Sequence, residues 1–124
     1  MLDTLEKSSV GVLHLGAGRY APGDFRHSTF DIWRELAKGF RRYTVVGRSK
    51  LSVGASFTEG GVDVRLLGSR TASEAEFLFT QFRAMSIAEE VAPDVVVAQC
   101  PVQGGLVAAQ IARRSGVKVL MEFH

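Results

Sequence analysis

Small residues gather in two segments whose composition suits the binding of a phosphate or a sugar. The first, residues 16–24 (GAGRYAPGD), satisfies the glycine pattern of dinucleotide-binding loops at Gly16, Gly18 and Ala21. In that pattern a helix already runs through the third small residue, whereas the proline and glycine that follow here disfavour a helix. A loop that needs glycines only for its turns is the other interpretation of the segment.

Arginines follow three of the apolar runs in the sequence. Arg19, Arg48 and Arg70 would lie at one edge of the sheet if these runs are parallel strands. Arginines grouped at such an edge favour phosphate or carboxylate ligands through charge-assisted hydrogen bonds. Arg48 also stands where a dinucleotide-binding domain has its ribose-binding acid, so an NADP 2′-phosphate is an alternative ligand. Solvated loop arginines without a ligand are the simpler interpretation.

The second segment, residues 99–105 (QCPVQGG), follows another apolar run and precedes a helix. We expect Gln99 and Gly104 to lie at the same mouth of the sheet as the first segment. Cys100 is placed where a helix N-terminus would activate a thiol, but Leu106 occupies the arginine position of the phosphatase pattern. We therefore interpret Cys100 as a structural thiol.

The elements that must position these segments alternate between short apolar runs and longer amphipathic ones. We expect strands over residues 10–15, 43–46, 62–67, 95–98 and 117–123, with a loop through the glycines at 54, 60 and 61. We expect helices from about Phe25 to Gly39, from a capping box at Thr71 and Glu74 to Pro93, and from Gly105 to Gly116. The pattern predicts the α/β class, as a Rossmann-like, doubly wound, three-layer parallel sheet of about five strands in the order 3-2-1-4-5.

Length and composition fit a single domain over residues 1–124. Hydrophobic residues make up 46% and charged residues 23%, and a net charge of +2 is too small to indicate a nucleic-acid binder. No apolar run approaches the roughly 18 residues of a transmembrane segment, and the single cysteine fits a reducing, cytoplasmic setting. The three histidines stand apart in sequence, so we predict no metal site.

Several segments together resemble a known family. Residues 92–101 (APDVVVAQCP) and 117–124 (VKVLMEFH) resemble its Pro-Asp, buried strand, proline loop, Gly-Val-x-Val strand and following histidine. Pro22-Gly23-Asp24 is similar to the family's loop of a proline and two glycines, and residues 36–46 to its first helix and second strand. Residues 49–91 contribute little. The chain thus resembles the N-terminal, acceptor-binding domain of a family 4-type glycosyltransferase of GT-B architecture.

This resemblance implies half of a retaining glycosyltransferase. The enzyme would transfer a sugar from a nucleotide-sugar donor, with no other cofactor, to a sugar or to an anionic small-molecule or lipid acceptor. A C-terminal donor-binding domain with paired glutamates would supply the other half of the site. The resemblance implies a catalytic role for His124, by positioning and charge stabilisation. The donor- or acceptor-binding residues would be Gly16, Gly18, Arg19, Gly23, Asp24, Arg48, Gln99 and Gly104.

Two residues depart from the family pattern. Asp24 replaces the second glycine of the pair that approaches the donor diphosphate, and Gln99 stands where many members have a histidine. A carboxylate beside a diphosphate is unfavourable unless Asp24 instead caps the following helix. A non-catalytic nucleotide- or sugar-binding module is the alternative function, and an NADP-binding domain is a further one.

Overall fold

A computed structural model describes residues 8–21, 28–71, 73, 76–77, 81–99 and 103–121. Its elements are β1 (Ser8–Tyr20), α1 (Ser28–Ala37), β2 (Phe40–Ser49), β3 (Ala55–Glu59), β4 (Val62–Leu67), α2 (Gln81–Val91), β5 (Val95–Ala98), α3 (Gln103–Ser115) and β6 (Lys118–Met121). Six strands form one sheet in the order β3-β4-β2-β1-β5-β6. Every neighbouring pair is parallel except β3 with β4. The α/β, Rossmann-like three-layer class is confirmed.

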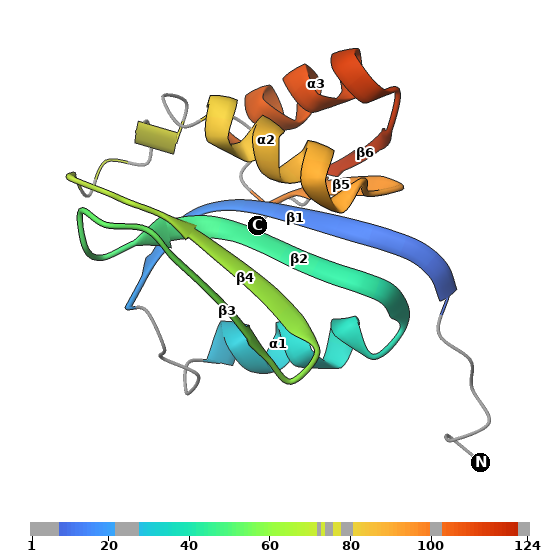
Figure 1. Cartoon of the computed structure of the whole chain (residues 1–124), viewed down its shortest axis with the longest axis horizontal. Coiled ribbons are helices and arrows are strands. Elements are labelled where there is room, and N and C mark those ends of the chain that lie inside the picture. The colour runs from blue at the N-terminus through green and yellow to red at the C-terminus, as the bar shows by residue number, and fades with distance from the viewer. Residues whose placement is uncertain are drawn as a thin grey trace.

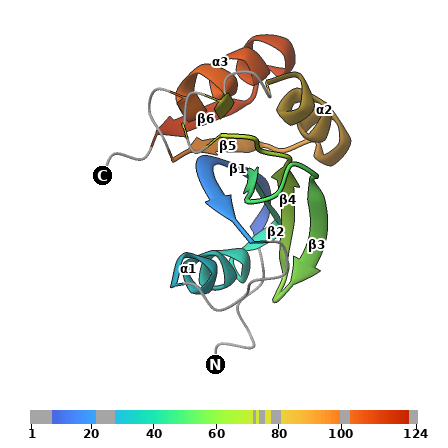
Figure 2. The ribbon, with the colours of Figure 1, turned by 90° about the vertical axis from the view of Figure 1, so that its left-hand side faces the viewer.

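Helices cover the two faces of the sheet unequally (Figure 1). α1 lies on one face, while α2 and α3 lie together on the other, as the turned view in Figure 2 shows. The chain moves outward from β1 to β2 in one direction and from β4 to β5 and β6 in the other. Because parallel crossovers are right-handed, these opposite directions place the helices on opposite faces.

Strand residues alternate between two apolar cores. Leu13 and Leu15 of β1 face the α2/α3 core, which includes Val96 and Ile111. Val12 faces the other core, where Trp33 of α1 packs against the sheet. Central strands that are buried on both faces must be apolar at nearly every position, which is why the sequence showed them as continuous runs.

The first strand is longer than we predicted. We expected it to end at Gly16, but β1 continues to Tyr20 and pairs again with β2 at Arg19 and Tyr20. The pairing register shifts between Leu15 and Arg19, so the added stretch contains a β-bulge. Glycine is a poor strand former, and the extension depends on the pairing with β2 that local sequence does not reveal.

A sixth strand replaces part of the loop expected between the second and third runs. β3 pairs antiparallel with β4 at the edge of the sheet. Gly60 and Gly61 join the two strands with φ of +58° and +81°. A two-residue turn with positive φ at both positions twists as a hairpin requires, and glycine adopts it without steric cost. The glycine pair was therefore the hairpin signal.

The predicted start of the second long helix is also wrong. α2 spans Gln81–Val91, and among the described residues between Thr71 and Gln81 only Glu76 and Phe77 are helical, in a 3₁₀ conformation. The Thr71 hydroxyl oxygen accepts a hydrogen bond from the Ser73 amide at 3.1 Å, as an N-cap would, but Ser73 is not helical, so this bond does not open the predicted helix. The carbonyl groups of Thr71 and Ser73 accept hydrogen bonds from Arg48, and the Ser73 carbonyl also accepts one from the Glu76 amide at 3.2 Å. Glu74 lies outside the described residues.

Candidate functional site

The carboxyl edge of the sheet has a break in its ladder at β1. β1 lies between β2 and β5, and the connections from these strands leave in opposite directions, which is where ligands bind in open α/β sheets. Register partners of β1 extend to Leu15 on both sides and resume only at Arg19, on the β2 side. The peptide groups of residues 16–18 therefore lie outside the regular ladder, at the switch point of the sheet.

Gln99 and Gly16 lie against each other at this break. The Gln99 amide nitrogen of the main chain donates to the Leu15 carbonyl at 2.8 Å, which continues the β5–β1 pairing by one step. A Cβ atom on Gly16 would come within 2.8 Å of Gln99 Oε1. The absence of a side chain at Gly16 thus makes room for the Gln99 amide, and two of the predicted site residues are brought together.

Gly18 makes room for an aromatic ring. A Cβ atom there would lie 2.7 Å from Tyr20 Oη, and one on Gly47 would lie 3.2 Å from Tyr20 Cε2. The Tyr20 ring in turn packs edge-on against Trp33, with centroids 5.3 Å apart. The glycines at 18 and 47 therefore let Tyr20 close the sheet against α1. A ligand contact at Gly18 would have to come from its peptide group.

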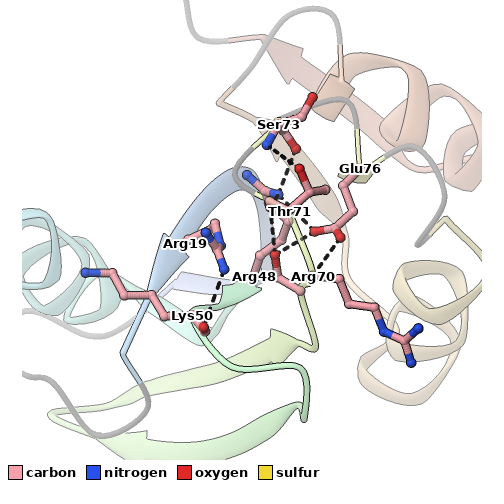
Figure 3. Close-up of polar contacts among 8 residues, drawn as sticks. Arg19, Arg48, Lys50, Arg70, Thr71, Ser73 and Glu76 are labelled. Atoms are coloured by element: carbon pink, nitrogen blue, oxygen red, sulfur yellow. Dashed lines mark hydrogen bonds and ion pairs between the residues drawn. The ribbon is translucent and has the colours of Figure 1, made fainter.

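Arg48 is buried among protein acceptors (Figure 3). Its side chain is 1% exposed, and Nη1 donates to Thr71 O at 2.9 Å, Ser73 O at 2.8 Å and Glu76 Oε1 at 3.0 Å. These contacts tie the segment after β4 to the end of β2. Arg48 is thus placed to hold the protein together rather than to face a ligand, which counts against the NADP alternative.

Glu76 is the residue of this cluster that the sequence analysis missed. Its carboxylate accepts hydrogen bonds from Ser69 Oγ at 2.6 Å and from the Arg70 amide at 2.9 Å, besides the Arg48 contact. Ser69, then the Arg70 amide, and then Arg48 lower the pKa of Glu76 to about 2. The available signal was a basic residue at the end of a buried strand, because such a charge needs an acidic partner.

The other cations of the edge do not gather around Arg48. Arg19 Nη2 lies 3.4 Å from the Lys50 carbonyl oxygen, and Arg19 is the register neighbour of Arg48. Figure 3 shows the side chains of Lys50 and Arg70 extending away from this cluster on opposite sides. The expected group of three convergent arginines is therefore reduced to Arg19, with Arg48 behind it.

The remaining predicted residues divide into two groups. Gly104 lies in the first turn of α3, which begins near the carboxyl end of β5. Gly23, Asp24 and His124 lie outside the described residues, as does Cys100. Within the described ranges, no three His, Cys, Asp or Glu residues are grouped so that they would hold a metal ion. None of the helices in the described part of the chain has the length and apolar character to cross a membrane.

We compared the chain with protein-family models, with curated proteins and with solved structures, and none of the three comparisons gave a match. The groups at the carboxyl edge are a carboxamide, a guanidinium and the peptide groups of a bulge. Such groups bind and orient hydroxyls and anions by hydrogen bonding.

Proposed function

We propose that this chain is the acceptor-side domain of a retaining GT-B glycosyltransferase that works in the cytoplasm with a nucleotide-sugar donor. The observation that carries the proposal is the break in β1 at the switch point, where Gln99 lies against Gly16. The order of the strands agrees with the segments of the sequence that resemble that family. The sugar, the nucleotide-sugar donor and the requirement for a second domain are inferred from the resemblance alone.

The residues of the edge would contribute binding and orientation. The Gln99 carboxamide offers both a donor and an acceptor, which suits a sugar hydroxyl. The peptide groups of residues 16–18, which have no register partner on either neighbouring strand, would offer further donors and acceptors. Holding an acceptor hydroxyl in line with the donor sugar makes transfer effectively intramolecular, which is a large part of such catalysis. His124 remains the expected catalytic residue of this proposal.

The experiment begins with the isolated chain. Amide NMR spectra are recorded while a panel of glycosides and nucleotide-sugars is added. We expect shifts at Gly16, Gln99 and Gly104 but not at the opposite edge, for example at Asp94. Gln99→Ala should weaken binding about five- to tenfold, the value of one or two lost hydrogen bonds, whereas Gln110→Ala on the exposed side of α3 should change it less than twofold.

Transfer is then measured with and without a donor-binding domain. We expect no turnover from the chain alone, because both domains contribute to a GT-B site. Turnover by the purified chain alone would contradict the proposal. In a protein that includes the donor-binding domain, His124→Ala should lower kcat on the order of 100-fold if this residue orients the reacting groups. Full activity of that variant would remove His124 from the site.

A non-catalytic nucleotide- or sugar-binding module is the second candidate. It is favoured by the chemistry of the described edge, where an amide, a guanidinium and peptide groups bind rather than react. Both candidates predict the same NMR shifts. They differ when a donor-binding domain is supplied, because a binding module would still show no transfer.

A further inference from the structure

Positive charge is concentrated at the carboxyl edge of the described structure. Arg19, Arg48, Lys50 and Arg70 lie there, and Glu76 is the one acidic partner that the structure gives to this group among the described residues. Elsewhere the arginines of the sheet have carboxylates beside them, as in the pairs Arg41–Asp94 and Arg42–Asp63. The carboxyl edge thus keeps an excess of cations that the rest of the sheet does not.

Within the described residues, Arg19 is a cation of this group that has no carboxylate partner and whose side chain is partly shielded from solvent. Its Nε–H is shielded from solvent and has no hydrogen-bond acceptor among the described residues. Nη2 makes only a long contact, 3.4 Å, with the Lys50 carbonyl oxygen. A shielded donor without an acceptor is costly, so such a group usually meets one from water, an ion or a ligand.

The neighbouring arginine does not compete for an anion. Arg48 has the same register position on β2, but its Nη1 is taken by Thr71, Ser73 and Glu76. The Tyr20 side chain packs on the α1 face, so the alternation along β1 directs Arg19 to the opposite face, on the side of Arg48. Among the described residues, an anion that approaches this side meets the Arg19 guanidinium, which has no carboxylate partner there, beside the Arg48–Glu76 pair.

We infer that the ligand of the carboxyl edge carries an anionic group, a phosphate or a carboxylate, and that the Arg19 guanidinium binds it. The planar guanidinium matches two oxygens of either group, and partial shielding strengthens the attraction. This inference rests on the proposed function, because it states the chemical class of the ligand at the same edge. The anion would come either from the diphosphate of the donor or from an acidic acceptor.

The test uses the full chain and four probes in matched pairs. UDP is compared with uridine, and glucose 6-phosphate with glucose, by NMR titration and calorimetry at 20 mM and 500 mM NaCl. UDP represents the diphosphate source and glucose 6-phosphate the acceptor source. We expect at least one anion to bind more tightly than its uncharged counterpart and to lose affinity in high salt, because salt screens the charge.

Arg19→Gln is the decisive variant, since it keeps a hydrogen-bonding side chain and removes the charge. Arg19→Gln should lower the affinity for the anion about tenfold or more. Arg19→Lys keeps the charge and should lower this affinity less. Arg113→Gln is the matched control, because it removes the same charge from the exposed last turn of α3. Unfolding curves for all variants check that each is folded. If Arg19→Gln does not fold, Arg19→Lys still tests the inference.

The outcomes separate this inference from the proposed function. If Arg19→Gln and Arg113→Gln change anion affinity equally, or if neither anion binds, the inference is overturned. Binding of uncharged glycosides at the edge would then leave the acceptor-domain proposal standing. Arg19 could be required for anion binding while no sugar is transferred in the presence of the donor-binding domain. In that case the inference stands and the glycosyltransferase proposal is contradicted.

Discussion

At the scale of single residues, the Arg48–Glu76 pair shows how a buried charge is accommodated. Arg48 is enclosed at the end of β2, and Glu76 provides the negative charge while Ser69 and the Arg70 amide satisfy its other acceptor positions. A buried pair of this kind adds little net stability over an apolar pair, but removing one partner leaves a charge uncompensated. The pair therefore matters most for the position of the segment that follows β4.

Glu76→Gln should lower the free energy of unfolding by about 3 kcal/mol at pH 7, because the buried Arg48 loses its counter-charge. Glu89→Gln is the control, since Glu89 is 73% exposed and lies 3.7 Å from Arg114, and its loss should cost less than about 0.5 kcal/mol. Urea unfolding of the three proteins measures both differences. Equal, small losses would show that Glu76 is not what holds Arg48.

The pH dependence of the same pair has a defined sign. The pKa of Glu76 falls from an ordinary 4.5 to about 2 in the folded state, so folding favours its charged form. Its stabilisation is complete above about pH 4.5 and is lost as the pH falls toward 2. The stability gap between the wild-type chain and Glu76→Gln should therefore narrow between pH 4.5 and 3. A gap of constant size over this range would contradict an electrostatic role.

At the scale of elements, two helices end in the same way with different residues. The amide of Gly116 donates to Ala112 O at 2.8 Å with φ of +71°, and that of Ala92 donates to Ala88 O at 2.8 Å with φ of +46°. Gly116 adopts this left-handed conformation without steric cost and ends α3 as the sequence predicted. In Ala92 the same conformation brings Cβ close to the backbone, which is unfavourable. α2 thus ends under strain just before Pro93.

The two helix ends offer a matched pair of substitutions. Ala92→Gly should raise the free energy of unfolding by about 1 kcal/mol, and Gly116→Ala should lower it by about 1 kcal/mol. Apart from its neighbours in the chain, no atom of the described residues lies within 4 Å of the position that a Cβ would take at Gly116, so its cost would come from the backbone alone. Thermal and urea unfolding test both signs. A loss of stability in Ala92→Gly would show that the conformation of Ala92 is not strained.

The loops after β2 and β4 also lie against each other, at the same edge as the candidate site. The Ser69 amide donates to Leu51 O at 2.9 Å, and a Cβ on Gly68 would collide with the Ser52 carbonyl oxygen. Gly68→Ala should therefore cost about 2 kcal/mol or more, since the obstacle is backbone. Gly39→Ala, where the nearest atom is 3.7 Å away, should be close to neutral. Equal effects in unfolding experiments would contradict this close approach.

At the scale of the whole molecule, the two faces of the sheet differ in cover. α2 and α3 close one face, whereas α1 is the one described helix on the other (Figure 2), and an apolar groove remains beside it. Val10 and Val97 line this groove together with Leu120, which is 58% exposed on β6. The uneven cover follows from the connections, because the β3 hairpin occupies the place of a second helix between β2 and β4.

The difference between the faces can be measured with one substitution type. Leu13→Ala should cost about 2–5 kcal/mol, because Leu13 is fully buried under α2 and α3 and its loss leaves a cavity. Leu120→Ala should cost less than about 1 kcal/mol, since its side chain is mostly in water. Urea unfolding at two protein concentrations gives both values. A large cost at Leu120 that grows with concentration would show that a second copy covers this face.

The sequence by itself determined the strand runs, their parallel order, the stop of α3 at Gly116 and the edge that carries the candidate site. These features follow from local apolar periodicity, from the turn preferences of glycine and from the handedness of parallel crossovers, all of which depend on neighbouring residues or general rules.

Only the tertiary structure decided the extension of β1 to Tyr20, the position of β3 and the partners of Arg48. Gly16 and Gly18 are weak strand formers, and β1 extends through them because it pairs again with β2 at Arg19 and Tyr20. The sequence around Arg48 does not reveal its structural role, because its partner Glu76 is 28 positions away. Contacts between distant segments settle such features, and no local pattern carries them.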